Sequence, residues 1–217
     1  MRAYIAELIG TFALVFCGTG AIIIDQQFDG AVTHAGVAIT FGLIVMSMIY
    51  SLGPVSGAHL NPAVSIAFTI AKRFPAKLLP GYITSQLAGA LLASFTLKFL
   101  FPLNELLGAT IPAGTEMQSF VLELILTFFL MLVIISVSVG SKEQGMFAGT
   151  AIGAVVGLEA MFAGPVCGAS MNPARSISPA IASGHIEHLW VYIIAPITGA
   201  LLAVPVANFL TIKTKTT

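Results

Sequence analysis

The chain alternates between long apolar segments and short polar connections, a pattern that predicts membrane-spanning helices. Six apolar segments reach about twenty residues, and a helix of that length rises about 30 Å, the thickness of the hydrocarbon core of a bilayer. We expect spans at residues 3–24, 33–52, 79–101, 119–139, 146–163 and 188–210. The sequence therefore predicts an all-α membrane protein whose main partner is the lipid bilayer.

Two shorter apolar segments, at residues 62–71 and 173–182, follow the second and the fifth span. Each would reach about 15 Å as a helix, so one alone cannot cross the bilayer but two meeting end to end can. Asn is a favoured N-cap, and Pro at the first helical position loses only an N–H group that has no partner. We therefore expect two re-entrant half-helices, which begin at the motifs Asn61, Pro62, Ala63 and Asn172, Pro173, Ala174.

The neighbourhoods of these two motifs are copies of each other. Residues 53–65 read GPVSGAHLNPAVS and residues 164–176 read GPVCGASMNPARS, so nine of thirteen positions are identical at a constant offset of 111. We interpret residues 1–110 and 111–217 as two repeats within a single domain, 1–217. Because three spans per repeat is an odd number, the second copy must enter from the opposite side. An inverted repeat of this kind has its functional centre at the midplane.

Charged residues are rare, and their order along the chain predicts the orientation. The chain is 57% hydrophobic and 8% charged, with zero net charge and a mean hydropathy of +0.99, so nothing indicates a nucleic-acid partner. If both termini are cytoplasmic, that side holds Arg2, Lys72, Arg73, Lys77, Lys142, Lys213 and Lys215. The outer side then holds Asp25, Asp29, Glu105, Glu116 and Glu187, with Lys98 near it. The positive-inside rule therefore predicts a multi-pass protein with cytoplasmic N- and C-termini, and we expect it in the cell (plasma) membrane.

The two half-helices predict a pore for neutral molecules. Placed N-terminus to N-terminus, each contributes roughly half a positive elementary charge, and Asn61 and Asn172 add NH2 donors at the same point. The loops at 53–60 and 164–171 cannot face lipid with unpaired backbone groups, so they must line a wet cavity or be buried in protein. Arg175 follows the second motif, and an arginine at membrane depth usually marks a pathway. Small uncharged solutes are therefore favoured over cations.

These features resemble the major intrinsic protein family, the aquaporins and aquaglyceroporins. The resemblance extends over essentially the whole chain and rests on both Asn-Pro-Ala motifs, on Arg175, on the paired Glu7 and Glu123, and on six spans with two half-helices. It implies a homotetramer with one pore in each subunit, and no cofactor, metal or enzyme activity. It also implies that the half-helix dipoles and the arginine exclude protons and cations, as they do in aquaporin pores.

The resemblance also implies a selectivity filter at four positions, which fall on Phe41, Ala160, Ala169 and Arg175. Strict water channels typically place His at the position of Ala160, so the two alanines imply a wider opening. Glycerol facilitators usually carry Asp directly after the arginine, where this chain has Ser176. The amino-acid sequence around both motifs is most similar to that of the nodulin-like intrinsic proteins of plants and their prokaryotic relatives. This implies passage of water, glycerol-like polyols and undissociated metalloid acids such as arsenous or boric acid.

Other functions remain open from the sequence. A strict water channel is the alternative within the family, if other side chains fill the space beside the alanines. Inverted repeats with broken helices also describe alternating-access secondary transporters, which dependence on an ion gradient would distinguish. Spacing indicates no nucleophile–base pair and no metal-ligand cluster, so an enzyme is not expected.

Several single residues allow two interpretations. Glu7 and Glu123 could form a proton relay. We favour a supporting role, in which each accepts hydrogen bonds from backbone N–H groups of the loop in its own half. Glu159 has no counterpart in the first half and could confer pH sensitivity. His59 could line the inner vestibule or pack against neighbours, and Cys167 could be open to mercurials or buried.

The fifth span carries a glycine at every fourth position, at Gly149, Gly153 and Gly157. In lipid, small residues at this spacing let helix backbones approach closely. We therefore expect this span to pack tightly against a neighbouring helix.

Overall fold

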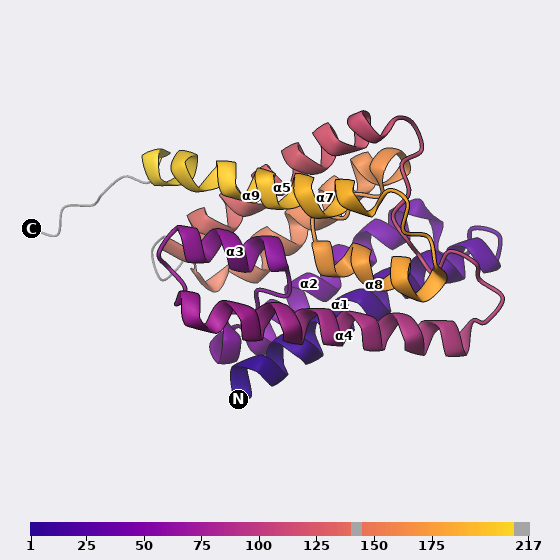
Figure 1. Cartoon of the computed structure of the whole chain (residues 1–217), viewed down its shortest axis with the longest axis horizontal. Coiled ribbons are helices and arrows are strands. Elements are labelled where there is room, and N and C mark those ends of the chain that lie inside the picture. The colour runs from indigo at the N-terminus through magenta and orange to yellow at the C-terminus, as the bar shows by residue number, and fades with distance from the viewer. Residues whose placement is uncertain (140–144, 211–217) are drawn as a thin grey trace, which may run out of the picture.

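The computed structural model describes residues 1–139 and 145–210, and these form an all-helical bundle (Figure 1). Six of its helices are long and apolar enough to cross a membrane: α1 (Arg2–Gln27), α2 (Thr33–Ser56), α4 (Leu79–Leu100), α5 (Glu116–Val139), α7 (Ala148–Cys167) and α9 (Leu189–Leu210). Two half-length helices are α3 (Pro62–Ile70) and α8 (Pro173–Ser183), and the short 3-10 helix η1 (Ala76–Leu78) leads into α4. The predicted fold of six spans and two half-helices is confirmed.

The two re-entrant loops are shorter than the sequence predicted. We expected the second and fifth spans to end before Gly-Pro, but α2 continues through Pro54 and α7 through Pro165. Each helix ends instead at a glycine with left-handed backbone, Gly57 (φ +84°) and Gly168 (φ +82°). The N–H groups of these glycines still bond to the carbonyls of Gly53 and Gly164, so the last turn is closed although the proline lacks a donor. The stop signal is therefore the glycine.

Helix packing follows the same plan in both halves. In the first half α1 packs against α2 and α4, and in the second half α5 packs against α7 and α9. At Gly89 of α4 an added Cβ would overlap the carbonyl oxygen of Leu8, and at Gly199 of α9 it would overlap that of Leu124. These two pairs occupy corresponding positions of the two halves. Such matched contacts are what two copies of one repeat would make.

The halves are joined by α2 and α7 and by the half-helices. A Cβ at Gly153 would lie 2.5 Å from the carbonyl oxygen of Gly42, and a Cβ at Gly149 would lie 2.7 Å from the ring of Tyr50. The glycine spacing of the fifth span therefore does let the two backbones approach closely. In addition, α3 packs against α9 and α8 packs against α4, so each half-helix also contacts the opposite half. In Figure 1, α3 and α8 enter from opposite ends of the bundle.

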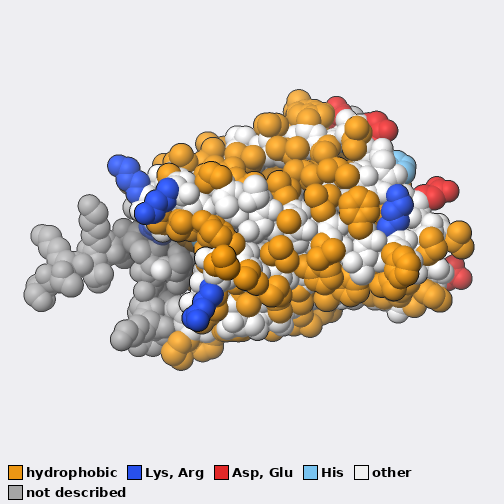
Figure 2. Space-filling view, turned by 60° about the horizontal axis from the view of Figure 1, so that its bottom comes forward, with side chains coloured by type: hydrophobic (Ala, Val, Ile, Leu, Met, Phe, Trp, Pro, Cys, Tyr) orange, Lys and Arg blue, Asp and Glu red, His pale blue; other side chains and the backbone are white. Residues whose placement is uncertain are grey.

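Charged side chains gather at the two ends of the bundle, with a hydrophobic belt between them (Figure 2). Arg2 at the start of α1 and Lys72 after α3 lie at one end, whereas Asp25 near the end of α1 and Glu116 at the start of α5 lie at the other. Lys98 is the basic exception at the acidic end, and its Nζ donates to the carbonyl of Ala182, 2.6 Å away in the last turn of α8. A cation is stabilised at a helix C-terminus by the macrodipole. Lys142, Lys213 and Lys215 lie outside the described residues.

The paired glycines give a stability prediction. Gly89→Ala and Gly199→Ala should each lower the stability by about 2 kcal/mol, because the added methyl forces a helix away from a backbone carbonyl. Thermal unfolding in detergent should show the melting temperature fall by roughly 5 °C in both variants. Gly53→Ala is the control, since an added Cβ there meets nothing within 4 Å. Unequal effects at the two corresponding glycines would contradict the matched packing.

Candidate functional site at the junction of the half-helices

The two half-helices meet through reciprocal hydrogen bonds between their N-cap asparagines and the opposite loops. Asn61 Nδ2 donates to the carbonyl of Met171 at 2.7 Å, and Asn172 Nδ2 donates to the carbonyl of Leu60 at 2.8 Å. Each Oδ1 accepts from the backbone of its own helix, at Ala63 N in α3 and at Ala174 N in α8. An amide NH2 has two donors, so each asparagine keeps a second N–H for another acceptor.

Both loops before these asparagines have strained backbone. In the first, Ala58 (φ +46°) and Leu60 (φ +52°) adopt left-handed conformations, and in the second Ala169 (φ +41°) and Met171 (φ +53°) do the same. Such conformations cost a residue with a side chain about 1–3 kcal/mol each, and they persist only where surrounding contacts fix them. The loops must therefore be held in place by other groups.

Glu7 of α1 provides that support in the first half. Its Oε1 accepts from His59 N at 2.9 Å and from the Ser56 hydroxyl, and its Oε2 accepts from Leu60 N at 2.7 Å and from the Gln86 amide. The carboxylate is fully buried. One side chain thus satisfies two backbone donors that have no water available at this depth.

Glu123 of α5 occupies the corresponding place in the second half. It accepts from Ser170 N at 2.7 Å and from Met171 N at 2.8 Å, and it is also fully buried. Its negative charge also interacts with the guanidinium of Arg175. The buried cation therefore has an opposite charge within the same half of the molecule.

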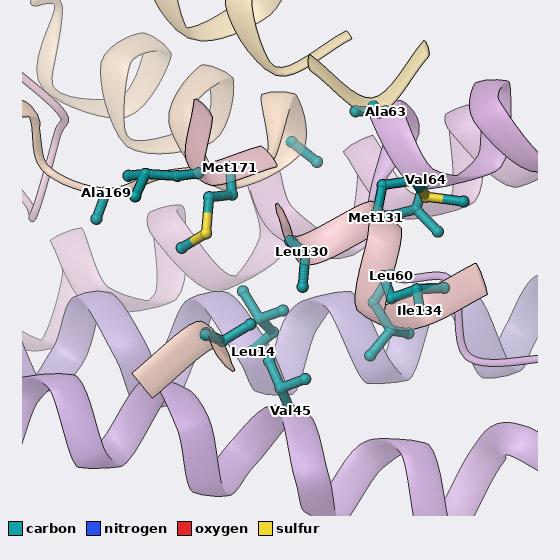
Figure 3. Close-up of a cluster of buried hydrophobic side chains, with 14 of the residues drawn as sticks. Leu14, Val45, Leu60, Ala63, Val64, Leu130, Met131, Ile134, Ala169 and Met171 are labelled. Carbon is teal, nitrogen blue, oxygen red and sulfur yellow. The ribbon is translucent and has the colours of Figure 1, made fainter. Parts of the chain in front are cut away.

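An internal cavity of about 160 Å³ passes this junction. Its lining includes Ala148, Ile152, Val156 and Ala160, which recur at every fourth residue of α7. The cavity therefore follows this helix for twelve residues, about 18 Å. Apart from Asn61, Asn172 and Arg175, most of the wall is apolar. Figure 3 shows part of the buried apolar wall, whose cavity-lining members include Leu14, Val45, Leu130 and Ile134.

At one end of the cavity the structure brings together all four predicted filter positions. Phe41, Ala160, Ala169 and Arg175 all line it. Arg175 is only 2% exposed, and its Nη1 donates to the carbonyl of Gly108 at 2.8 Å. Its guanidinium carbon lies 5.2 Å from the centroid of the Phe41 ring. A guanidinium has five N–H donors, so further donors remain for a molecule in the cavity.

The other end of the cavity is lined by the repeat counterparts of these four residues, and none of the counterparts is charged. At the offset of 111, the counterparts of Phe41, Ala160, Ala169 and Arg175 are Ile152, Ile49, Ala58 and Val64. All four counterparts line the cavity as well. The inverted repeat thus builds two similar ends, and a valine stands where the other end has the arginine.

Comparison with known proteins identifies the family to which the chain belongs. Residues 1–206 match the family model of the major intrinsic proteins. The chain belongs to this family. Aquaporin NIP1-1 of Zea mays is 48% identical over 202 residues, which cover 93% of this chain and 72% of that protein. Nodulin-26 of Glycine max is 43% identical over 209 residues, which cover 96% of this chain and 77% of that protein.

A solved structure gives the same result. The X-ray structure of the aquaglyceroporin from Plasmodium falciparum superposes with a TM-score of 0.82 at 28% identity, covering 96% of this chain and 98% of that one. The major intrinsic proteins are channels and not enzymes. The chain is therefore an aquaporin-type channel.

Two residues with open interpretations, His59 and Cys167, have clear positions in the structure. His59 does both things considered for it: it lines the cavity, and its ring packs against Phe68, 4.9 Å away between centroids, with Nδ1 3.1 Å from the Ser65 hydroxyl. Cys167 is fully buried, and its sulfur accepts from Ala169 N at 3.4 Å, as the Ser56 hydroxyl does from Ala58 N in the other loop. A buried thiol in such a structural bond is poorly placed to meet a mercurial.

Glu159 and Ser176 lie behind the cavity wall. Glu159 is 8% exposed, is absent from the cavity lining, and its Oε2 has no hydrogen-bond partner among the described residues. Ser176 is fully buried, accepts a hydrogen bond from the Thr110 hydroxyl at 2.9 Å, and shares a hydrogen bond with the hydroxyl of Ser170 in the re-entrant loop. The residue after the arginine therefore supports the loop and does not contact the cavity.

Reasoning from the sequence missed most of the apolar wall. Leu14 and Leu130 correspond at an offset of 116, as Glu7 and Glu123 do, and Val45 and Val156 correspond at 111. Applying the repeat offset to every position of the spans would have paired these residues. It would not have shown that they face the cavity, because periodicity alone gives no direction in a helix that is apolar on all sides.

The two supporting glutamates give the second prediction. Replacing Glu7 by Gln puts an NH2 group against donors, and each lost bond to a charged acceptor costs about 1.5–3 kcal/mol. We expect Glu7→Gln to lower the melting temperature in detergent more than Glu123→Gln, because Glu7 accepts four hydrogen bonds from α2, α4 and its loop, whereas Glu123 accepts two from the backbone of its loop.

Glu159→Gln is the matched control, because its carboxylate oxygen Oε2 has no such partner in the described part of the chain. This variant should melt at or above the temperature of the unsubstituted protein. A loss as large as that of Glu7→Gln would show that burial of the acid, and not its hydrogen bonds to the loop, determines the effect.

Proposed function

We propose that this channel passes water and small uncharged solutes, among them glycerol-like polyols and undissociated metalloid acids such as arsenous or boric acid. The observation that carries the proposal is the composition of the cavity wall that Arg175 shares with Phe41, Ala160 and Ala169, because both alanines present only methyl groups there. With two small walls, the opening is limited by one ring and one guanidinium. Arsenous and boric acids resemble polyols because each is a neutral molecule with three hydroxyl groups.

The proposed filter divides its work between polar and apolar sides. Arg175 offers fixed N–H donors to a hydroxyl oxygen, and the Phe41 ring offers an apolar surface to a carbon or metalloid centre. Deeper in the pore, the remaining N–H of Asn61 and that of Asn172 offer the next two donors. Molecules that pass in single file can therefore move from one donor to the next and keep a hydrogen bond at each step.

Cations and protons meet the opposite conditions along the same path. The N-termini of α3 and α8 both point to the junction, and each carries roughly half a positive charge. Arg175 adds a full positive charge at the constriction. No carboxylate lines the cavity in the described part of the chain, because Glu7 and Glu123 lie buried behind the loops whose N–H groups they accept. We therefore propose that the channel excludes ions, as aquaporin pores do by the same means.

The wider assembly follows the family resemblance. We propose a homotetramer with a pore in each subunit, placed in the cell membrane with cytoplasmic termini. The relatives support the solute class only in part. The similar solved structure is that of an aquaglyceroporin, whereas the NIP relative is named an aquaporin. We also propose that the channel domain consists of two inverted repeats, 1–110 and 111–217.

Solute permeability tests the proposal directly. Liposomes containing the protein should re-swell rapidly in a glycerol gradient and should shrink rapidly in a sucrose gradient, both followed by stopped-flow light scattering. Ala160→Leu should lower glycerol permeability by about tenfold or more and water permeability less, because one added side chain in a close-fitting site changes discrimination by about 10–200-fold. Arsenous acid uptake should change in the same direction as glycerol.

Ala154→Leu provides the control for this variant. Ala154 lies on the same helix but on its exposed face and does not line the cavity, so the added side chain leaves the cavity unchanged. Water flux without glycerol flux in the unsubstituted protein would leave a strict water channel. Dependence of glycerol flux on an ion gradient would instead indicate a transporter.

Orientation can be tested with single cysteines at the two ends of the bundle. In intact cells, a membrane-impermeant maleimide should label Asp29→Cys and should leave Lys77→Cys unlabelled until the cells are opened. The unsubstituted protein shows the background from its own free thiols, Cys17 and Cys167. The reverse pattern would place the termini outside.

A further inference from the structure

One neighbour of the Phe41 ring lies outside the four filter positions. A Cβ built on Gly18 of α1 would lie 2.5 Å from ring atom Cδ1 of Phe41, and closer still to Cε1 and Cζ. Ordinary contacts of a Cβ begin at 3.4 Å. The ring therefore occupies the space that any side chain at position 18 would need.

The glycines of α1 differ in what a Cβ would meet, and at Gly10 it would meet the flexible end of the Leu60 side chain. Gly20, two residues further along the helix, would place a Cβ 3.4 Å from the end of the Leu97 side chain, which is an ordinary contact. A methyl group is tolerated there. At Gly18 the obstacle is a rigid ring that faces the cavity and stands 5.2 Å from the guanidinium carbon of Arg175.

The second half of the molecule shows what happens without this glycine. Gly18 corresponds to Ile134 at the offset of 116, and Phe41 corresponds to Ile152 at the offset of 111. Both isoleucines line the cavity. At that end a branched side chain stands where the first half has only hydrogen. The space for an aromatic ring against the helix therefore exists in one half only.

We propose that Gly18 is a specificity-determining residue of the channel, because it lets the Phe41 ring rest against the backbone of α1 and keeps the ring out of the lumen. A methyl group at position 18 moves Cδ1 from 2.5 Å to at least the 3.4 Å of an ordinary contact, a shift of at least 0.9 Å, and Cε1 and Cζ must move further. The ring moves away from α1, toward the cavity that it lines. The inference rests on the proposed function, in which this constriction selects solutes by size.

Four variants test the proposal: Gly18→Ala, Gly20→Ala, Phe41→Ala and the double variant Gly18→Ala/Phe41→Ala. Each is reconstituted into liposomes, and permeabilities to water and glycerol are measured by stopped-flow light scattering. We expect Gly18→Ala to lower the glycerol-to-water permeability ratio by about tenfold, the scale on which one carbon changes discrimination in a close-fitting site. Gly20→Ala should leave the ratio unchanged. In the Phe41→Ala background the substitution at Gly18 should have no effect, because the ring that it displaces is gone.

Three results would overturn the proposal. These are an unchanged ratio in an assembled Gly18→Ala tetramer, an equal loss in the presence and absence of the Phe41 ring, and a Gly18→Ala protein that does not assemble, since the ring could then not yield into the lumen. An unsubstituted protein that passes water but not glycerol would contradict the proposed function instead. In that case the same four variants are compared by water permeability, which Gly18→Ala should lower only when the ring is present.

Discussion

Backbone N–H groups in the middle of a membrane have no water to bond with, and the arrangement of this chain follows from that constraint. Two loops descend to the midplane in strained conformations, and their donors must be satisfied by protein. Glu7 and Glu123 satisfy them from neighbouring helices. Because these carboxylates are occupied in this way, the pore is left with donors from two asparagines and one arginine. The two glutamates that hold the loops in place therefore also influence which polar groups face the pathway.

Much of this architecture could be predicted from the sequence, because the two repeats are recognisable in it. Two copies of Asn-Pro-Ala at a constant offset, separated by apolar segments of membrane length, predict six spans and two half-helices, and the family confirms that fold. Helix ends were predicted less well. Gly53-Pro54 resembles a signal that ends a helix, but α2 continues to Ser56. Pro54 lacks an N–H group and therefore removes one backbone hydrogen bond, whereas the N–H of the left-handed Gly57 closes the last turn by bonding to the carbonyl of Gly53.

Side-chain direction was the information that the sequence lacked. The spans are apolar on nearly every face, so periodicity does not separate a residue that lines the cavity, such as Leu14, from one that meets lipid. The role of Gly18 depends on a ring contributed by a different helix, and no local pattern shows such a contact. The pairing of each asparagine with the opposite loop is likewise long-range. It is expected from the inverted repeat only once the two half-helices are placed end to end.

The reciprocal asparagine bonds have a consequence for how the protein is made. The acceptor for Asn61 is the carbonyl of Met171, 110 residues later, and the acceptor for Asn172 belongs to a loop that has long since left the ribosome. The first three spans can enter the membrane while the rest is being translated, but their half-helix has no end partner yet. The nascent chain therefore carries an unfinished pore through half of its synthesis. Both asparagines therefore gain their acceptors together, when the second loop folds inward against the first.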